Sequence, residues 1–184
     1  TDGTKSHGFF RGLLRGTRFG RNGDSRLRET FEELIEQHEE NEPPVDPVAR
    51  AMLDKVLTVG ALTVSDVMVP RADIIAVDVT IERNELLKLM VEEAHSRMPV
   101  YRGNLDDVLG MLHIKDMLAS IAAEELFDTR KLLREILFVA PSMRVLDLLL
   151  QMRQDRIHMA LVVDEYVGID GLTTIEDLVE QIVG

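Results

Sequence analysis

The sequence reads GLTTIED from Gly171 to Asp177, near the C-terminal end of the 184-residue chain. This stretch has the composition of a short apolar strand, followed by two threonines and a helix that begins with two carboxylates. A hydroxyl at such a junction can cap the helix, and the free N–H groups of the first helical turn attract anions. Two interpretations are open: an ordinary capped helix, or a site at which Asp177 holds sugar hydroxyls while the helix N-terminus holds phosphate.

The stretch closes the second copy of an internal repeat. Two series of strand-like runs and amphipathic helices align without a gap at an offset of 61 residues, so that Gly110 corresponds to Gly171 and Asp116 to Asp177. Each copy reads as a β-α-β-β-α unit, and one such unit does not bury its sheet alone. We therefore expect an α+β fold in which the two repeats pack as a pseudo-twofold pair. The GLTTIED stretch would then face the groove between them.

The expected elements follow from the alternation of apolar runs with helical periodicity. We expect strands at 74–77, 98–101, 108–112, 137–139, 159–163 and 171–173, and helices at 81–94, from 115 onward, at 144–154 and at 176–183. A polar turn at Gly103-Asn104 joins the second and third strands.

Amphipathic helices precede the repeats. Residues 25–41 have apolar positions at helical spacing, and the paired prolines at 43–44 end this segment. Asp46-Pro47 begins a second helix, which ends at Gly60. The sequence thus predicts a tail (1–24), a helical segment (25–62), a first repeat (63–124) and a second repeat (125–184).

Charge is divided unevenly along the chain. The net charge is -12, yet residues 1–28 carry seven Lys and Arg against Asp2 and Asp24. An acidic body argues against nucleic acid as a partner. The tail at 1–24, basic and partly apolar, has two interpretations: contact with an anionic membrane surface or a membrane protein, or a disordered end. No apolar run approaches the ~20 residues of a membrane span, so we expect a cytoplasmic chain that can lie at the inner face of the membrane.

Several motifs resemble those of one family. The β-α-β-β-α repeat with a Gly-hydrophobic-x-Thr-x-x-Asp junction resembles a tandem CBS-domain pair, or Bateman module. Asp66–Arg71, Ser96–Tyr101, and Asp164–Tyr166 leading into Gly171–Asp177 are similar to the CorC/HlyC family of magnesium and cobalt efflux and haemolysin-C-like proteins. The resemblance covers Asp46–Gly184. Family members often run on beyond this point, which suggests a piece of a longer protein.

The resemblance implies a binding site for an adenine nucleotide (AMP, ADP or ATP) in the cleft between the repeats. Asp177 would bind the ribose hydroxyls, while Thr174 with Thr173 would help to hold phosphate. Met159 and Ala160 would border the adenine. Arg97 would bind the phosphate tail, although an ion pair with one of the many acids remains an equal alternative for it.

The first copy departs from the motif. Gly110–Asp116 has His113 where the hydroxyl belongs, so a site there would be weak, altered or absent. We expect one good nucleotide site per chain. His113 is expected at a helix start or an interface rather than as a metal ligand, because no second ligand accompanies it at a suitable spacing.

No sequence motif of a nucleophile, a phosphate-binding loop or a paired-histidine metal site is present, and we expect no enzyme. The resemblance implies instead a regulatory module linked to magnesium and cobalt efflux, which dimerises through its CBS pairs. Mg²⁺ could bridge the nucleotide phosphates and the acidic rim of the cleft. The alternative is a dimerisation or interaction scaffold of a haemolysin-like protein, with a vestigial cleft and a tail that binds a membrane or a partner.

Overall fold

The structure is a computed structural model that describes residues 29–30, 32–35, 46–124 and 126–184. The chain divides into two units, Thr1–Ala61 and Leu62–Gly184. The basic tail predicted at 1–24 lies outside the described residues. The bounds of the four predicted segments stay a prediction.

In the first unit, residues 29–30 and 32–35 are helical. Helix α3 (Pro47–Val59) begins where the sequence predicts: the Asp46 side chain accepts a hydrogen bond from the Val48 N–H at 2.7 Å, and proline occupies the first turn. Gly60 follows as its C-cap. None of the described helices is long and apolar enough to cross a membrane.

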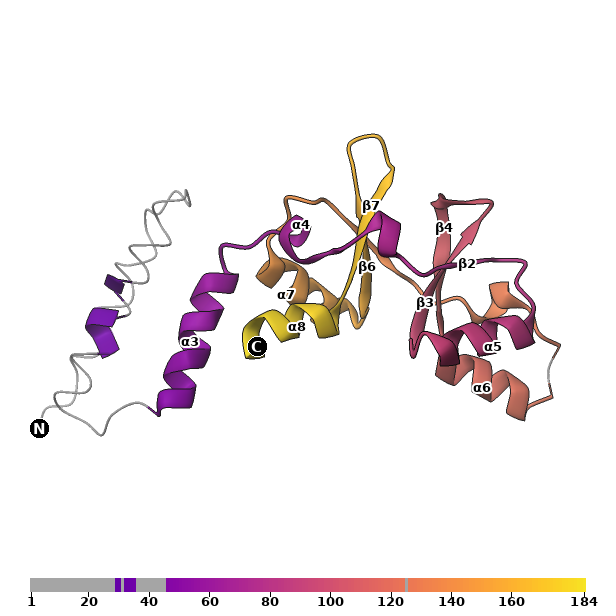
Figure 1. Ribbon diagram of the computed structural model, residues 1–184, viewed down its shortest axis with the longest axis horizontal. Coiled ribbons are helices and arrows are strands. Elements are labelled where there is room, and N and C mark those ends of the chain that lie inside the picture. The colour runs from indigo at the N-terminus through magenta and orange to yellow at the C-terminus, as the bar shows by residue number, and fades with distance from the viewer. Residues whose placement is uncertain (1–28, 31, 36–45, 125) are drawn as a thin grey trace, which may run out of the picture. The chain divides into compact units, whose positions relative to one another are not determined.

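The second unit contains a three-stranded and a four-stranded sheet, in which the three strands of each repeat have the same topology (Figure 1). The first repeat consists of β2 (Val77–Asp78), α5 (Arg83–Glu92), β3 (Arg97–Arg102), β4 (Asn104–His113) and α6 (Ile114–Ala122). The second repeat consists of β5 (Leu137–Val139), α7 (Val145–Asp155), β6 (Met159–Val163), β7 (Ile169–Thr174) and α8 (Ile175–Val183). In each, the first strand is parallel to the second and the third is antiparallel to it. The predicted α+β fold of two packed repeats is confirmed.

Each repeat also contributes backbone to the sheet of the other. Strand β1 (Val69–Pro70) precedes the first repeat's strands in sequence, yet it pairs antiparallel with β7 of the second repeat. At the corresponding edge of the first sheet, Met111 pairs in a single bridge with Arg134. The short helix α4 (Val64–Val67) likewise joins the second repeat, since the Val64 N–H donates to the Met143 carbonyl at 2.8 Å.

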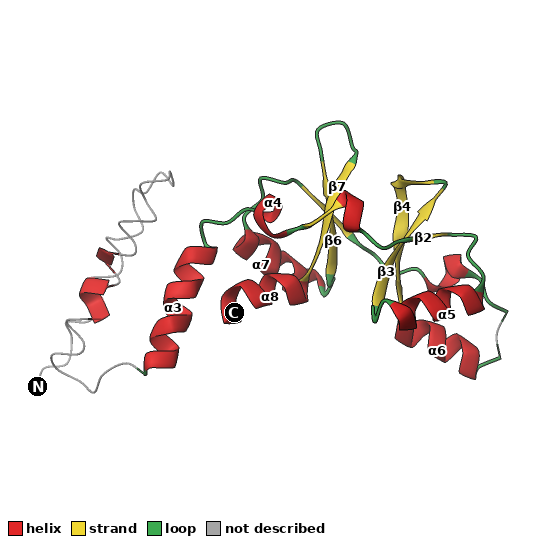
Figure 2. Cartoon of the chain, in the orientation of Figure 1, coloured by secondary structure: helices red, strands yellow, loops and turns green. Residues whose placement is uncertain are grey.

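Two apolar clusters result from the alternation of side chains along the strands. In the first repeat the helices α5 and α6 lie on one side of the sheet (Figure 2), where Leu86, Met90 and Met117 pack on Met98 and Leu112. A second cluster lies on the opposite sheet faces and joins the two repeats; its buried members are Met111, Met159, Leu161, Ile169 and Leu172. The repeats therefore share a core.

The strand predicted at 74–77 is largely wrong. Only Val77 of this run is in β2, and the 3-10 helix η1 (Arg71–Asp73) precedes it. Ile74 and Ile75 pack against the two different clusters, because this segment leaves β1 at the edge of one sheet and enters β2 in the other. The apolar run is thus buried by crossing between the sheets rather than by pairing in one. The other strands and helices predicted in the repeats lie within a few residues of their predicted bounds, whereas both ends of the helix predicted at 25–41 lie outside the described residues.

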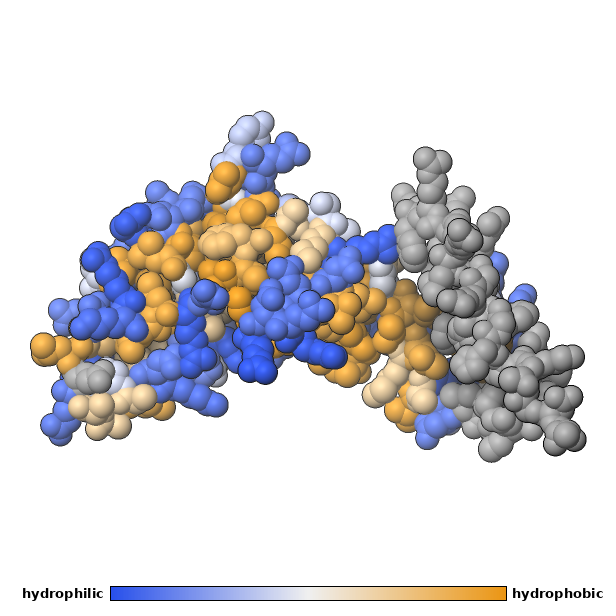
Figure 3. Space-filling model, turned by 180° about the vertical axis from the view of Figure 1, so that it is seen from behind, coloured by the Kyte–Doolittle hydropathy of each residue, from blue (hydrophilic) through white to orange (hydrophobic). Residues whose placement is uncertain are grey.

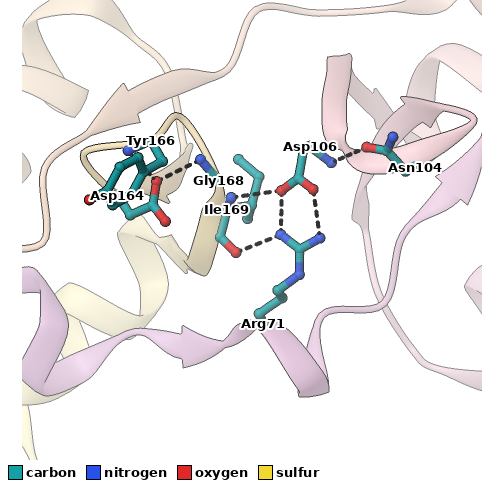
Figure 4. A network of polar contacts seen from close by, with 7 residues as sticks. All are labelled: Arg71, Asn104, Asp106, Asp164, Tyr166, Gly168 and Ile169. Carbon is teal, nitrogen blue, oxygen red and sulfur yellow. Dashed lines mark hydrogen bonds and ion pairs between the residues drawn. The ribbon is translucent and has the colours of Figure 1, made fainter.

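A polar network also joins the two repeats (Figure 4). The Arg71 guanidinium donates to both carboxylate oxygens of Asp106, and its Nη1 donates to the Ile169 carbonyl at 2.8 Å. The Ile169 N–H donates to Asp106 Oδ1 at 2.9 Å. The contact with Arg71 holds the pKa of Asp106 below its ordinary value. The start of β4 is therefore tied to the start of β7.

Candidate functional site

The N-terminus of α8 has both features that its sequence predicts. Thr174 is the N-cap: its backbone N–H and its hydroxyl donate to Asp177 Oδ2 at 2.7 and 2.8 Å, and the Asp177 N–H donates to Thr174 Oγ1 at 3.3 Å. This reciprocal arrangement is a capping box. Asp177 Oδ1 accepts no hydrogen bond from the described part of the chain. The cap uses one carboxylate oxygen and leaves the other for a ligand.

A cavity of about 200 Å³ opens beside this cap, and we call it the Asp177 cavity. Segments of both repeats line it. Its apolar wall is formed by Val69, Ile74, Ile75, Pro99, Met159 and Leu172, and its polar groups are Asp73, His95, Arg97, Thr174 and Asp177. An apolar wall with a few convergent polar groups is typical of small-molecule sites.

The structure brings four of the six predicted site residues together on this cavity: Arg97, Met159, Thr174 and Asp177. Ala160 and Thr173 are paired neighbours on β6 and β7, and both are fully buried. They do not line the cavity, and the Thr173 hydroxyl has no hydrogen-bond partner among the described residues. Contact of Ala160 and Thr173 with a ligand stays a prediction. Because their side chains do not line the cavity, their backbone atoms would have to make this contact.

Arg97 projects from the start of β3 and is held by the second repeat. Its Nη1 lies 2.8 Å from Glu176 Oε1, and its Nη2 lies 3.2 Å from His158 Nδ1. The side chain is only 19% exposed. The ion-pair alternative for Arg97 is therefore present in the structure, while its contact with phosphate stays a prediction.

A second cavity, of about 660 Å³, lies beside His113 at the matching position of the first repeat, and we call it the His113 cavity. His113 is the N-cap of α6, and its Nδ1 accepts a hydrogen bond from the Lys115 N–H at 3.0 Å. Burial lowers the pKa of His113, and the cations of Arg97 and Arg134 lower it further. The neutral ring fits its role as an acceptor. The expectation that His113 lies at a helix start is confirmed.

Asp116, the counterpart of Asp177, forms an ion pair with Arg134. Arg134 Nε donates to its Oδ2 at 2.6 Å, and Arg134 Nη2 donates to its Oδ1 at 2.7 Å. This bidentate contact lowers the pKa of Asp116. The Arg134 guanidinium thus neutralises and orients Asp116, whereas Asp177 has no ion pair among the described residues. The equivalent carboxylates of the two repeats therefore differ: Asp116 is paired with an arginine, and Asp177 is held by the capping box of its own helix.

The sequence argument missed the basic character of the His113 cavity, which Lys115, Arg134 and Arg156 line together with Arg97 and His158. The aligned repeats contained part of this information. At the offset of 61 residues the acid Asp73 of the first copy corresponds to the base Arg134 of the second, and Arg97 corresponds to His158. Within the described ranges, no group of three or more acids or histidines is arranged to hold a metal ion.

Comparison with known proteins agrees with this architecture. The CBS domain family model matches residues 64–123 and 129–184. The curated relative "Possible hemolysin C" of Rickettsia akari (strain Hartford) is 46% identical over 136 residues, which are 73% of this chain and 45% of the relative. The chain thus spans about half the length of the curated relatives that it matches.

The solved structures that are similar to this chain include two nucleotide complexes. The CBS domain of the bacterial CNNM/CorC family Mg²⁺ transporter in complex with ATP matches with a TM-score of 0.69 and 34% identity, over 75% of this chain and 99% of that one. A CBS-domain pair with bound AMP from Klebsiella pneumoniae matches with a TM-score of 0.56 and 31% identity, over 67% and 99%. The chain belongs to the CBS-domain family and is a tandem CBS pair of the CorC/HlyC kind.

Proposed function

We propose that this CBS pair is a regulatory module that binds an adenine nucleotide in the Asp177 cavity, within a CorC-like protein linked to magnesium and cobalt efflux. The observation that carries the proposal is the state of Asp177. Its Oδ2 is fixed by the capping box while its Oδ1 accepts no bond from the described residues. A carboxylate with one immobilised oxygen is oriented before the ligand arrives, which lowers the entropic cost of binding.

The remaining groups suit the other parts of a nucleotide. Met159 and Pro99 offer apolar surface for the base, and the N-terminus of α8 attracts phosphate. The relatives solved with ATP and with AMP support the same class of ligand. Since the cavity is smaller than the roughly 300–1,000 Å³ of typical ligand pockets, we expect the phosphates to extend beyond it, past Arg97.

Regulation would follow because three separate segments of the chain form the cavity wall. Val69 belongs to β1, Pro99 to the first repeat, and Thr174 to the second. A ligand that contacts all three favours one relative position of these segments, provided that its affinity differs between the positions. Mg²⁺ would act in this scheme by bridging phosphates and nearby acids such as Asp73.

Isothermal titration of the 184-residue chain with AMP and with ATP, each with and without MgCl₂, tests the proposal. Asp177→Asn should abolish measurable binding of AMP, because the amide is a poorer acceptor for two hydroxyls. Asp116→Asn is the matched control, since it makes the same change at the equivalent position of the other repeat, and it should leave the AMP affinity within about twofold. Equal affinity of wild type and Asp177→Asn would exclude the proposed site.

A second role, as a homodimeric scaffold, is favoured by exposed apolar side chains on helices of both repeats. They are Val91, Leu118, Leu150, Val179 and Val183. Figure 3 shows one face of the chain, on which hydrophobic residues form patches between hydrophilic ones. Light scattering after size-exclusion chromatography would compare wild type with Leu150→Glu, and an unchanged mass would remove α7 from such an interface.

We also propose that the chain lies in the cytoplasm, where residues 1–24 contact the inner membrane face or a membrane protein. Co-sedimentation with anionic liposomes, before and after deletion of these residues, tests this role.

A further inference from the structure

The His113 cavity contains a cluster of basic groups that the proposed nucleotide site does not explain. Four cationic side chains line it, Arg97, Lys115, Arg134 and Arg156, against the two carboxylates of Glu135 and Asp155. The chain as a whole has a net charge of -12. An excess of positive charge in a cavity of an acidic protein needs a specific explanation.

Two of these cations have no ion pair among the described residues, namely Lys115 and Arg156. Arg134 is held in place by Asp116, and Arg97 by Glu176. Arg156 has a left-handed backbone with φ of 57°, a conformation that costs free energy for a residue other than glycine. The cavity thus combines two fixed guanidinium groups with two cations that are available to a ligand.

The neutral groups of the cavity favour an anion as well. The α6 backbone N-terminus lies at His113, which is itself only 8% exposed. Burial lowers the pKa of His113 more than the nearby cations do, and its Nδ1 accepts a hydrogen bond from the Lys115 N–H at the start of α6. Two guanidinium groups and one ammonium group around a helix N-terminus are suited to phosphoryl oxygens, which accept several charged hydrogen bonds at once.

We propose that the His113 cavity binds phosphoryl anions through Lys115, Arg156 and Arg97. We expect a phosphoryl group rather than a ribose to be held here, because Arg134 already pairs with Asp116 and His113 stands where the motif has a hydroxyl. The phosphoryl group can come from two sources: a free anion such as pyrophosphate, or the terminal phosphates of a nucleotide whose adenosine lies in the Asp177 cavity. The second source is possible because Arg97 lines both cavities. Only this second source, the nucleotide, rests on the proposed function of the Asp177 cavity.

The test is isothermal titration of the full chain with pyrophosphate, AMP and ATP. The variant is Lys115→Gln/Arg156→Gln, in which two exposed side chains are changed and the fold should be retained. Its matched control is Lys131→Gln/Arg153→Gln, which removes the same two charges from exposed positions outside the cavity. Circular dichroism and urea denaturation check that both variants fold.

Two results support the proposal and identify the source. If the anion is free, pyrophosphate binds wild type and Asp177→Asn alike, and the cavity variant weakens it about tenfold or more. If the anion is a nucleotide tail, the cavity variant weakens ATP about tenfold but leaves AMP unchanged. The control variant should weaken the binding of neither pyrophosphate nor ATP. Unchanged pyrophosphate and ATP affinities in the cavity variant overturn the proposal, whereas failure of AMP binding in wild type overturns only the proposed nucleotide function.

Discussion

Arg97 Nη2 lies 3.2 Å from His158 Nδ1, and these two residues occupy equivalent positions, 61 residues apart, in the two repeats. A guanidinium only donates hydrogen bonds, so His158 Nδ1 is the acceptor and a proton on the neutral ring is at Nε2. Residues that are equivalent in two repeats and touch each other lie beside the pseudo-twofold axis. Arg97 lines both the Asp177 cavity and the His113 cavity, whereas His158 lines only the latter, so a ligand in either cavity would lie beside Arg97.

Removal of the partner of Arg97 should strengthen phosphate binding. In Glu176→Gln the guanidinium loses its 2.8 Å ion pair and becomes available to a ligand. We expect the ATP affinity to rise about two- to fivefold, because an ion pair with an exposed partner contributes at most about 1 kcal/mol. Titration calorimetry measures the change. Glu180→Gln, one turn further along α8, makes the same change in charge without touching Arg97, and an equal rise in this control would assign the effect to net charge alone.

The edge strand β1 should depend on the absence of a side chain at Gly171. A Cβ at this position would lie 2.7 Å from the Val69 carbonyl oxygen and would also collide with the Met68 side chain. Gly171→Ala must therefore push β1 away from β7, and we expect a loss of about 1–3 kcal/mol in the free energy of unfolding. Urea denaturation measures it. Gly103→Ala is the comparison, since nothing lies within 4 Å of its Cβ and only its φ of 75° is unfavourable. A smaller loss for Gly171→Ala than for Gly103→Ala would contradict the close approach of β1.

The unpaired hydroxyl of Thr173 should cost stability. This side chain is fully buried in the second repeat, and its oxygen has no partner among the described residues. Thr173→Val keeps the shape and removes the polar atom, so the free energy of unfolding should rise by about 1 kcal/mol. Thr173→Ala, which leaves a void instead, should lower it. The AMP affinity of Thr173→Val should equal that of wild type, since only a side chain outside the Asp177 cavity is changed. A weaker affinity would show that the hydroxyl contacts the ligand.

His113 should make the fold less stable in mild acid. Burial and the cations of Arg97, Arg134 and Lys115 lower its pKa in the folded state, and the carboxylate of Asp116 opposes them only in part. The unfolded chain then binds more protons than the folded one, so stability rises with pH and is lost as the pH falls below the ordinary histidine value of about 6.5.

His113→Gln should therefore flatten the stability profile measured by urea denaturation between about pH 7 and pH 5. His95→Gln is the comparison, since it makes the same substitution at an exposed position. An unchanged slope in His113→Gln would assign the acid sensitivity to other groups.

Short-range patterns accounted for the elements of the repeats. Thr174 and Asp177 are three residues apart, and the capping box that joins them is a local arrangement that the first helical turn alone can form. Gly103 likewise marks the turn between β3 and β4, where φ is 75°. The offset of 61 residues predicted that two equivalent sheets would pack together, because neither buries its apolar side chains alone.

The sequence by itself thus determined the repeat and the capping box of Thr174 and Asp177, the two residues of the repeat motif that line the Asp177 cavity. Only the tertiary structure decided which of the two equivalent carboxylates is paired with an arginine. Arg134 reaches Asp116 from 18 residues away, and Arg97 reaches Glu176 from 79. It also decided that β1 joins the sheet of the other repeat. The physical reason is that ion pairs and edge pairing depend on which segments the shared core brings together, and no local periodicity encodes that choice.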